Sequence, residues 1–184
     1  KAGQPIPGDA DLVLIPGSKS TRGDLAFLRE QGWDIDLYAH RRRGGHILGV
    51  CGGYQMLGQS IADPDGLEGP AGKTKGLGLL EVSTVMSAAK TLREVTAVDA
   101  GSGLAVEGYE IHLGLTEGSD SQRPFGYVDQ LPEGACSEDG RVQGSYLHGL
   151  FREDAFRQSF LTMLGASAHD LSYDKSLDDV LDRL

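Results

Sequence analysis

Cys51 lies in a glycine-rich stretch, Gly49-Val50-Cys51-Gly52-Gly53, that follows an apolar run. This spacing matches the nucleophile-elbow pattern, in which a reactive side chain occupies a sharp turn from a strand into a helix. Side chains two positions before and after the nucleophile would clash there, so glycine is required at both. The turn also places the thiol at the amino end of a helix, whose dipole favours the reactive thiolate. A buried structural cysteine on a glycine-rich turn is the alternative interpretation.

Two further stretches could supply partners for this thiol. His148 follows a predicted strand, Val142–Tyr146, and a histidine could take the thiol proton and later protonate a leaving amine. The segment Ile15–Thr21 contains a Pro-Gly-Ser turn. Its free backbone N–H groups could hold a tetrahedral oxyanion together with the N–H of Gly52. Taken singly, the histidine could equally be an ordinary surface residue, and the turn an ordinary loop.

The elements that must position these residues alternate along the first third of the chain. Apolar runs predict buried strands at Asp11–Ser18 and at His46–Val50. Helices are predicted at Arg22–Gly32, at Asp34–Gly45 with Asp34 as N-cap, and at Tyr54–Ile61. This order is typical of an α/β fold with a parallel sheet.

The pattern changes after Ile61. Residues Ala62–Gly78 are rich in glycine and proline and predict a loop. Strand-like pieces follow at Leu79–Val85, Arg93–Val98, Val106–Gly114, Pro124–Asp129 and Arg141–Gly149. The last predicted helix, Glu153–Leu164, carries its large apolar residues on one face, and the segment Ser167–Leu184 is polar with weak periodicity.

Bulk properties exclude several classes of function. The 184 residues fit one domain, and the net charge of −10 argues against binding to nucleic acid or to an anionic membrane. Two cysteines and no export signal point to free thiols in the cytoplasm. The histidines lack metal-ligand spacing, so no metal is expected. Leu67 occupies the first glycine position of a phosphate-binding loop, which argues against ATP binding here.

Five stretches together resemble the class I, triad-type glutamine amidotransferases, and within them the cobyric acid synthase and cobyrinic acid a,c-diamide synthase group. These stretches are LIPGSKST, GVCGGYQMLG, GLGLLEVST, GYEIHLG and GSYLHGLF, in that order. The first and last favour the cobyric acid synthase branch. The resemblance implies a flavodoxin-like α/β domain, with a mostly parallel central sheet flanked by helices and additional strands, that hydrolyses glutamine to glutamate and ammonia.

The resemblance also implies roles for individual residues. Cys51 would form a γ-glutamyl thioester, and His148 would act as base and acid. The backbone N–H groups of Gly17 and Gly52 would form the oxyanion hole. The glutamine pocket would include Ser18, Gln55, Tyr109 and His112.

One position departs from the wider class. Many class I members have a glutamate two residues after the histidine, where this chain has Leu150. The cobyric acid group is similar in lacking it, so the departure agrees with the narrower resemblance. What orients the imidazole of His148 stays open, with Glu110 or a backbone carbonyl as candidates.

The resemblance further implies a two-part enzyme, in which an amino-terminal ATP-dependent synthetase activates corrin carboxylates. Residues 1–184 would be one amidotransferase domain, a fragment without its first strand and without that synthetase. Glutamine and the synthetase domain are the expected partners. The domain needs no cofactor of its own, because ATP and Mg²⁺ would bind the synthetase. Amidation of another acid, such as a cell-wall precursor, and a non-catalytic regulatory domain are the alternatives.

Overall fold

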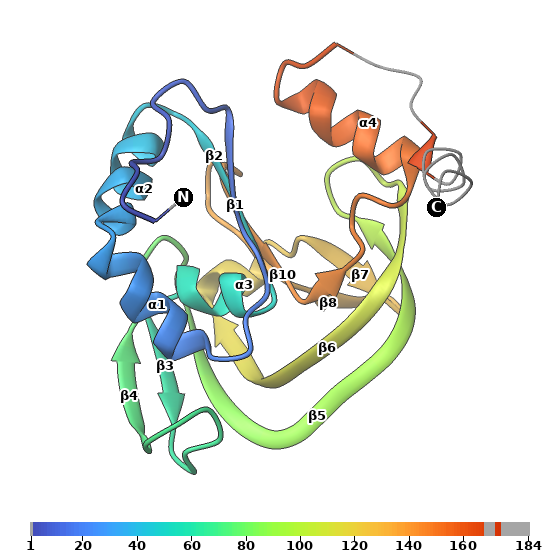
Figure 1. Cartoon of the computed structure of the whole chain (residues 1–184). Helices are drawn as coiled ribbons and strands as arrows, with labels where there is room; N and C mark the ends of the chain where they lie inside the picture. Colours follow the sequence, from blue (N-terminus) through green and yellow to red (C-terminus); the bar gives the residue numbers. More distant parts are fainter. Residues whose placement is uncertain (1, 168–171, 174–184) are drawn as a thin grey trace, which may run out of the picture.

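The computed structural model describes residues 2–167, 172 and 173. Its central sheet has the strand order β1-β2-β10-β9, in which β1 (Leu12–Ile15), β2 (His46–Val50) and β10 (Val142–Ser145) are parallel. The short strand β9 (Ala135–Cys136) pairs antiparallel with β10. Parallel strands end at the same edge of a sheet, so the residues that follow β1, β2 and β10 lie close together (Figure 1).

Helices cover both faces of this sheet, as the α/β prediction requires. On one face, α1 (Thr21–Glu30), α2 (Trp33–Arg42) and α3 (Gly52–Leu57) share an apolar core that includes Ile47 of β2. On the other, α4 (Asp154–Met163) packs with Leu48 of β2 in a second apolar cluster. Side chains alternate along a strand, so neighbouring residues of β2 serve opposite cores.

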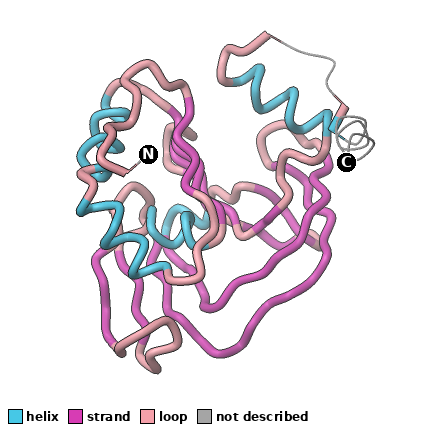
Figure 2. Tube along the Cα trace, in the orientation of Figure 1, coloured by secondary structure: helices cyan, strands magenta, loops and turns pink. Residues whose placement is uncertain are grey.

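A second, largely antiparallel sheet curves beneath the first (Figures 1 and 2). Its main path runs β11-β6-β5-β3-β4, and its longest strands, β5 (Val82–Asp99) and β6 (Ala105–Gly118), form one hairpin. The other strands are β3 (Ser60–Asp63), β4 (Gly72–Lys75), β7 (Gly126–Val128), β8 (Leu131–Glu133) and β11 (Leu147–His148). A 3₁₀ turn, Ser119–Gln122, follows β6.

Three local predictions are wrong. Asp34 does not cap α2, because Gly32 occupies the N-cap and Asp34 lies in the first turn. The helix predicted to reach Ile61 ends at Leu57, and Ile61 belongs to β3. The segment predicted as a loop contains β4, which pairs with β3.

Four other elements agree with the sequence predictions. β1, α1, β2 and α4 occupy the stretches predicted for them. Most of the polar segment Ser167–Leu184 lies outside the described residues.

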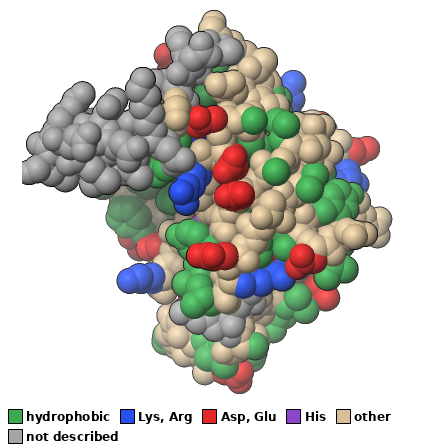
Figure 3. Space-filling view, turned by 90° about the vertical axis from the view of Figure 1, so that its right-hand side faces the viewer, with side chains coloured by type: hydrophobic (Ala, Val, Ile, Leu, Met, Phe, Trp, Pro, Cys, Tyr) green, Lys and Arg blue, Asp and Glu red, His purple; other side chains and the backbone are tan. Residues whose placement is uncertain are grey.

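The part of the chain that is described holds no helix of the length and apolarity needed to cross a membrane. On the face shown in Figure 3, acidic, basic and apolar side chains are interspersed.

Candidate active site

Cys51 occupies the turn between β2 and α3 in a strained backbone conformation. Its φ is 53° and its ψ is −112°, which side-chain-bearing residues rarely adopt. Its N–H donates to the carbonyl of Ser145 at 2.8 Å, and its carbonyl accepts from the N–H of Gln55 at 3.1 Å. The residue is therefore held on one side by the sheet and on the other by the helix, as the elbow pattern predicts.

The flanking glycines are required by close backbone approach. A Cβ built on Gly49 would lie 2.7 Å from the backbone of Gly53. A Cβ built on Gly53 would lie only 2.0 Å from the carbonyl oxygen of Ile15. The clash expected two residues before and after Cys51 is therefore present at both positions.

The thiol and the imidazole open into one cavity of about 550 Å³. Its lining residues are Gly17, Ser18, Lys19, Thr21, Cys51, Gln55, Leu67, Glu68, Ile111, His112, Leu113 and His148. Most residues proposed from sequence are thus brought together. Gly52 and Tyr109 are outside this lining, and Tyr109 lines the neighbouring grooves.

Gly17 lies beside the side chains of both Cys51 and His148. A Cβ built on it would lie 3.6 Å from the Cβ of Cys51 and 3.1 Å from Cε1 of His148. Gly52 packs closely against the same turn, since a Cβ there would lie 2.9 Å from the backbone nitrogen of Ser18. The end of β1 and the start of α3 are therefore in contact beside the thiol.

Burial keeps the Cys51 thiol protonated. Its pKa is raised above the ordinary value, chiefly by desolvation, while a hydrogen bond from the Gly52 backbone lowers it and the charge of Glu68 raises it. The expectation that the helix end would favour the thiolate is therefore wrong on balance, because desolvation outweighs it. The sulfur donates to the backbone carbonyl of Ile111, with 3.2 Å between Sγ and O.

His148 is neutral, and no carboxylate within the described residues bonds to it. Desolvation lowers its pKa, and a hydrogen bond to the Ile111 backbone partly raises it again. Among the described residues, its buried Nε2 has no hydrogen-bond partner. Its ring stacks on that of Tyr109, with centroids 5.0 Å apart and planes 6° apart. A free ring nitrogen is what a base for Cys51 needs.

Gln55 uses its amide within the protein. Its Nε2 donates to the carbonyl of Leu113 at 2.9 Å and to the hydroxyl of Tyr146 at 3.1 Å, and its Oε1 accepts from the hydroxyl of Thr21 at 3.3 Å. The side chain therefore ties α3 to α1, to β6 and to Tyr146, which lies between β10 and β11, while forming part of the cavity wall.

His112 is also held within the wall. Its Nδ1 lies 3.2 Å from the carbonyl of Gly114, and its ring stacks on Tyr146 with centroids 3.8 Å apart. Burial lowers its pKa, so it is neutral at physiological pH.

Glu68 lines the cavity and was missed from the sequence. Its Oε2 accepts from the backbone N–H of Thr21 at 2.7 Å, and its Oε1 accepts from the hydroxyl of that residue at 3.2 Å. Asp63 shapes the loop by accepting from the N–H groups of Leu67 and Glu68. The carboxylate reaches the site through the fold of the β3–β4 connection, so no sequence motif predicts its position there.

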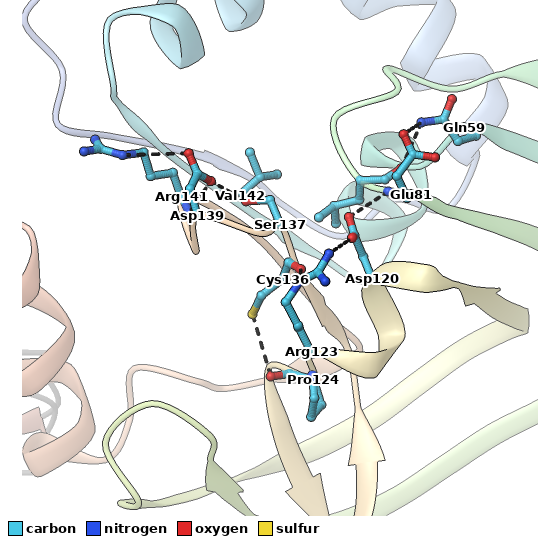
Figure 4. Close-up of polar contacts among 11 residues, drawn as sticks. Gln59, Glu81, Asp120, Arg123, Pro124, Cys136, Ser137, Asp139, Arg141 and Val142 are labelled. Atoms are coloured by element: carbon cyan, nitrogen blue, oxygen red, sulfur yellow. Dashed lines mark hydrogen bonds and ion pairs between the residues drawn. The ribbon is translucent and has the colours of Figure 1, made fainter.

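Cys136 lies on β9, in a separate network of polar contacts (Figure 4). Its thiol donates to the carbonyl of Pro124 at 3.7 Å, and burial raises its pKa to about 12. In the described part of the chain, no three side chains of the metal-ligating types cluster together.

Comparison with known proteins identifies the family of the chain. A family model described as the CobB/CobQ-like glutamine amidotransferase domain matches residues 1–156. A cobyric acid synthase of Rhodobacter capsulatus is 67% identical over 99% of this chain and 38% of its own length. A cobyric acid synthase of Bradyrhizobium diazoefficiens is 64% identical over 100% of this chain and 38% of its own length. The chain thus spans well under half of these relatives.

Solved structures share the fold at low sequence identity. A glutamine amidotransferase crystal structure aligns with a TM-score of 0.58 and 20% identity, over 85% of this chain and 80% of its own. The PurLQS structure from Thermotoga maritima aligns with a TM-score of 0.59 and 18% identity, over 85% and 81%. At these identities the likeness concerns the fold alone, whereas the family model and the relatives concern the sequence. The chain therefore belongs to the CobB/CobQ-like glutamine amidotransferase domain family.

Proposed function

We propose that this chain hydrolyses glutamine to glutamate and ammonia through a thioester on Cys51. The observation that supports this most is the strained cysteine whose thiol opens into the same cavity as a partnerless imidazole nitrogen of His148. A structural cysteine has no need of either feature, because strain and an unpaired buried nitrogen both cost free energy.

In the proposed reaction, His148 takes the proton of the Cys51 thiol as sulfur attacks the amide carbon of glutamine. The N–H groups of Gly17 and Gly52 stabilise the resulting oxyanion. The C–N bond then breaks as the imidazolium protonates the leaving nitrogen, which departs as ammonia. Neutral His148 next activates a water molecule, which attacks the thioester and releases glutamate and the thiol.

The charges of the cavity complement those of a free amino acid. Lys19 and Glu68 are its two oppositely charged wall residues, and glutamine carries an α-carboxylate and an α-ammonium group. We assign the ammonium group to Glu68 and the carboxylate to Lys19 and Ser18. Gln55 and His112 shape the wall, since the amide of Gln55 and Nδ1 of His112 already have partners within the protein.

The ammonia would serve a second reaction. Because the relatives that span this whole chain are named cobyric acid synthase, we infer amidation of corrin side-chain carboxylates in cobalamin biosynthesis. The ATP and Mg²⁺ that activate those carboxylates would bind sequence beyond these 184 residues. The thioester chemistry is the same whichever acid is amidated, so the corrin substrate needs its own test in the full-length protein.

The decisive experiment uses 6-diazo-5-oxo-norleucine, an electrophilic analogue of glutamine, with peptide mapping and a glutamate assay. Wild-type protein should form one adduct at Cys51 and release glutamate from glutamine, and Cys51→Ser should do neither. Cys136→Ser, which alters the other thiol, should behave as wild type. An adduct at Cys136 alone, or glutamate release by Cys51→Ser, would reject the proposal.

A further inference from the structure

The proposed reaction needs a fixed imidazole, and the usual carboxylate is missing. Leu150, at the position where many class I members carry glutamate, is buried at 3% exposure and apolar. Glu110 is engaged elsewhere, because its Oε2 accepts from Nε of Arg93 at 2.6 Å. In the register between β6 and β11, Glu110 lies opposite Leu147.

The same register places Tyr109 directly opposite His148. Residues opposite each other in an antiparallel pair project to the same face of the sheet, where their side chains meet. Here the two rings are nearly parallel, with 5.0 Å between centroids and 6° between planes. The tyrosine is 44% exposed, so core packing does not explain its large ring.

We propose that Tyr109 is the positioning residue of His148, holding the imidazole by ring stacking where other amidotransferases use a carboxylate. This inference rests on the proposed function and names what orients its base. A Cβ built on Gly17 would lie 3.1 Å from Cε1, so the imidazole contacts a glycine at one atom and an aromatic ring on one face. Stacking fixes the ring plane while leaving the buried Nε2 free for the thiol proton.

The Tyr109 ring that stacks on His148, called the clamp below, also differs chemically from a carboxylate because it is neutral. An adjacent carboxylate would favour the imidazolium ion and raise the pKa of the histidine. A tyrosine ring adds no full charge, which agrees with the lowered pKa of His148, caused by burial and partly offset by the Ile111 backbone. The base therefore stays unprotonated before glutamine arrives.

Three variants in the full-length protein test the clamp. Tyr109→Leu should lower the kcat of glutamine hydrolysis about tenfold or more with KM little changed, because misplaced catalytic groups cost rate. Tyr109→Phe keeps the ring and should restore most of kcat. Tyr127→Leu removes a tyrosine of similar exposure, 41%, from β7 and should match wild type. Wild-type kcat in Tyr109→Leu, or a loss as large in Tyr109→Phe, would overturn the proposal.

A spectroscopic measurement needs no activity. The stacked tyrosine should shift the ring proton resonances of His148 upfield in the wild-type NMR spectrum, with the signals assigned by their loss in His148→Gln. The shift should persist in Tyr109→Phe and vanish in Tyr109→Leu. Unshifted signals in wild type would refute the clamp even if the leucine variant does not fold. Absence of glutamate release by wild type with the shift present would instead reject the proposed function.

Discussion

The thiol of Cys51 hydrogen-bonds to the backbone carbonyl of Ile111, with 3.2 Å between Sγ and O. Its proton is thus held by an uncharged acceptor, and burial raises its pKa. The same backbone acts on the imidazole of His148. The resting site therefore holds a neutral thiol and a neutral imidazole, so in the proposed reaction the proton moves only when glutamine reacts.

Replacement of His148 by alanine should abolish most glutamine hydrolysis. A positioned acid and base contributes about 100- to 10,000-fold to a rate, so glutamate release should fall by at least about 100-fold. Cys51 should remain open to iodoacetamide at pH 9, measured by mass spectrometry, which shows that the pocket is intact. Wild-type turnover in this variant would remove His148 from the mechanism.

The pH dependence should reveal a neutral pair. Because the pKa of His148 lies below its ordinary 6.5, kcat/KM should rise through an apparent pKa under 6.5 and then level off. Because the pKa of Cys51 lies above 9.0, its reaction with iodoacetamide should be slow at neutral pH, rise steadily with pH and not level off until the pH exceeds 9. Rapid alkylation at pH 6 would instead indicate a thiolate–imidazolium pair.

Glu68→Gln should weaken glutamine binding. The amide keeps an acceptor for Thr21 but loses the charge that pairs with the α-ammonium group. Hydrogen bonds to charged groups contribute about 1.5–3 kcal/mol, so KM should rise about 10- to 100-fold while kcat changes little. Asp65→Asn removes an exposed charge from the same loop and serves as control. An unchanged KM in Glu68→Gln would exclude this carboxylate from substrate binding.

Glu133 should make folding stability fall as pH rises. Its carboxylate accepts from the hydroxyl of Ser145 and the N–H of Tyr146, and burial raises its pKa from 4.5 to about 7. Between pH 4.5 and about 7, Glu133 is protonated in the folded state but ionised in the unfolded state. Its contribution to folding stability is therefore complete below pH 4.5 and declines as the pH rises toward 7. The decline should be about 3 kcal/mol, at about 1.36 kcal/mol per pKa unit.

Urea unfolding of wild type and Glu133→Gln at several pH values measures this contribution. As pH rises from 4.5 to 7, the unfolding free energy of wild type should fall relative to that of Glu133→Gln. A difference that does not vary with pH would mean that the carboxyl group has an ordinary pKa in the folded protein.

Gly53→Ala should destabilise the fold around the nucleophile. The new Cβ would meet the carbonyl oxygen of Ile15 at 2.0 Å, so β1 and α3 must separate. Overpacking of this kind costs about 1–3 kcal/mol, visible in urea unfolding. Gly8→Ala has open space around its Cβ and should leave stability nearly unchanged. Equal stability of both variants would mean that the contact at Gly53 relaxes freely.

The sequence predicted the nucleophile turn well because its determinants are local. Apolar residues of β2, the glycines around Cys51 and the start of α3 occupy one continuous stretch, and each restricts the same few dihedral angles. Strands β1 and β2 likewise followed from short apolar runs ending in turn residues, whereas β10, with the sequence VQGS, has no such run.

The rest of the site depends on pairings between distant segments. Tyr109 meets His148 through the register of β6 with β11, and Glu68 reaches Thr21 because β3 and β4 form a hairpin. Neither strand pairing can be predicted from a local sequence pattern. In the case of β3, the strand is short and lies where a predicted helix meets a predicted loop. The raised pKa of Cys51 also follows from burial, which only the assembled fold determines.

Strand β6 contacts three of the side chains on which the proposed chemistry depends. It carries the ring that stacks on His148, the Ile111 carbonyl that accepts from Cys51 and the Leu113 carbonyl that accepts from Gln55. A slip of this single strand by one residue would disengage nucleophile, base and cavity wall together. These three contacts all depend on the position of one strand, so they form together or are lost together.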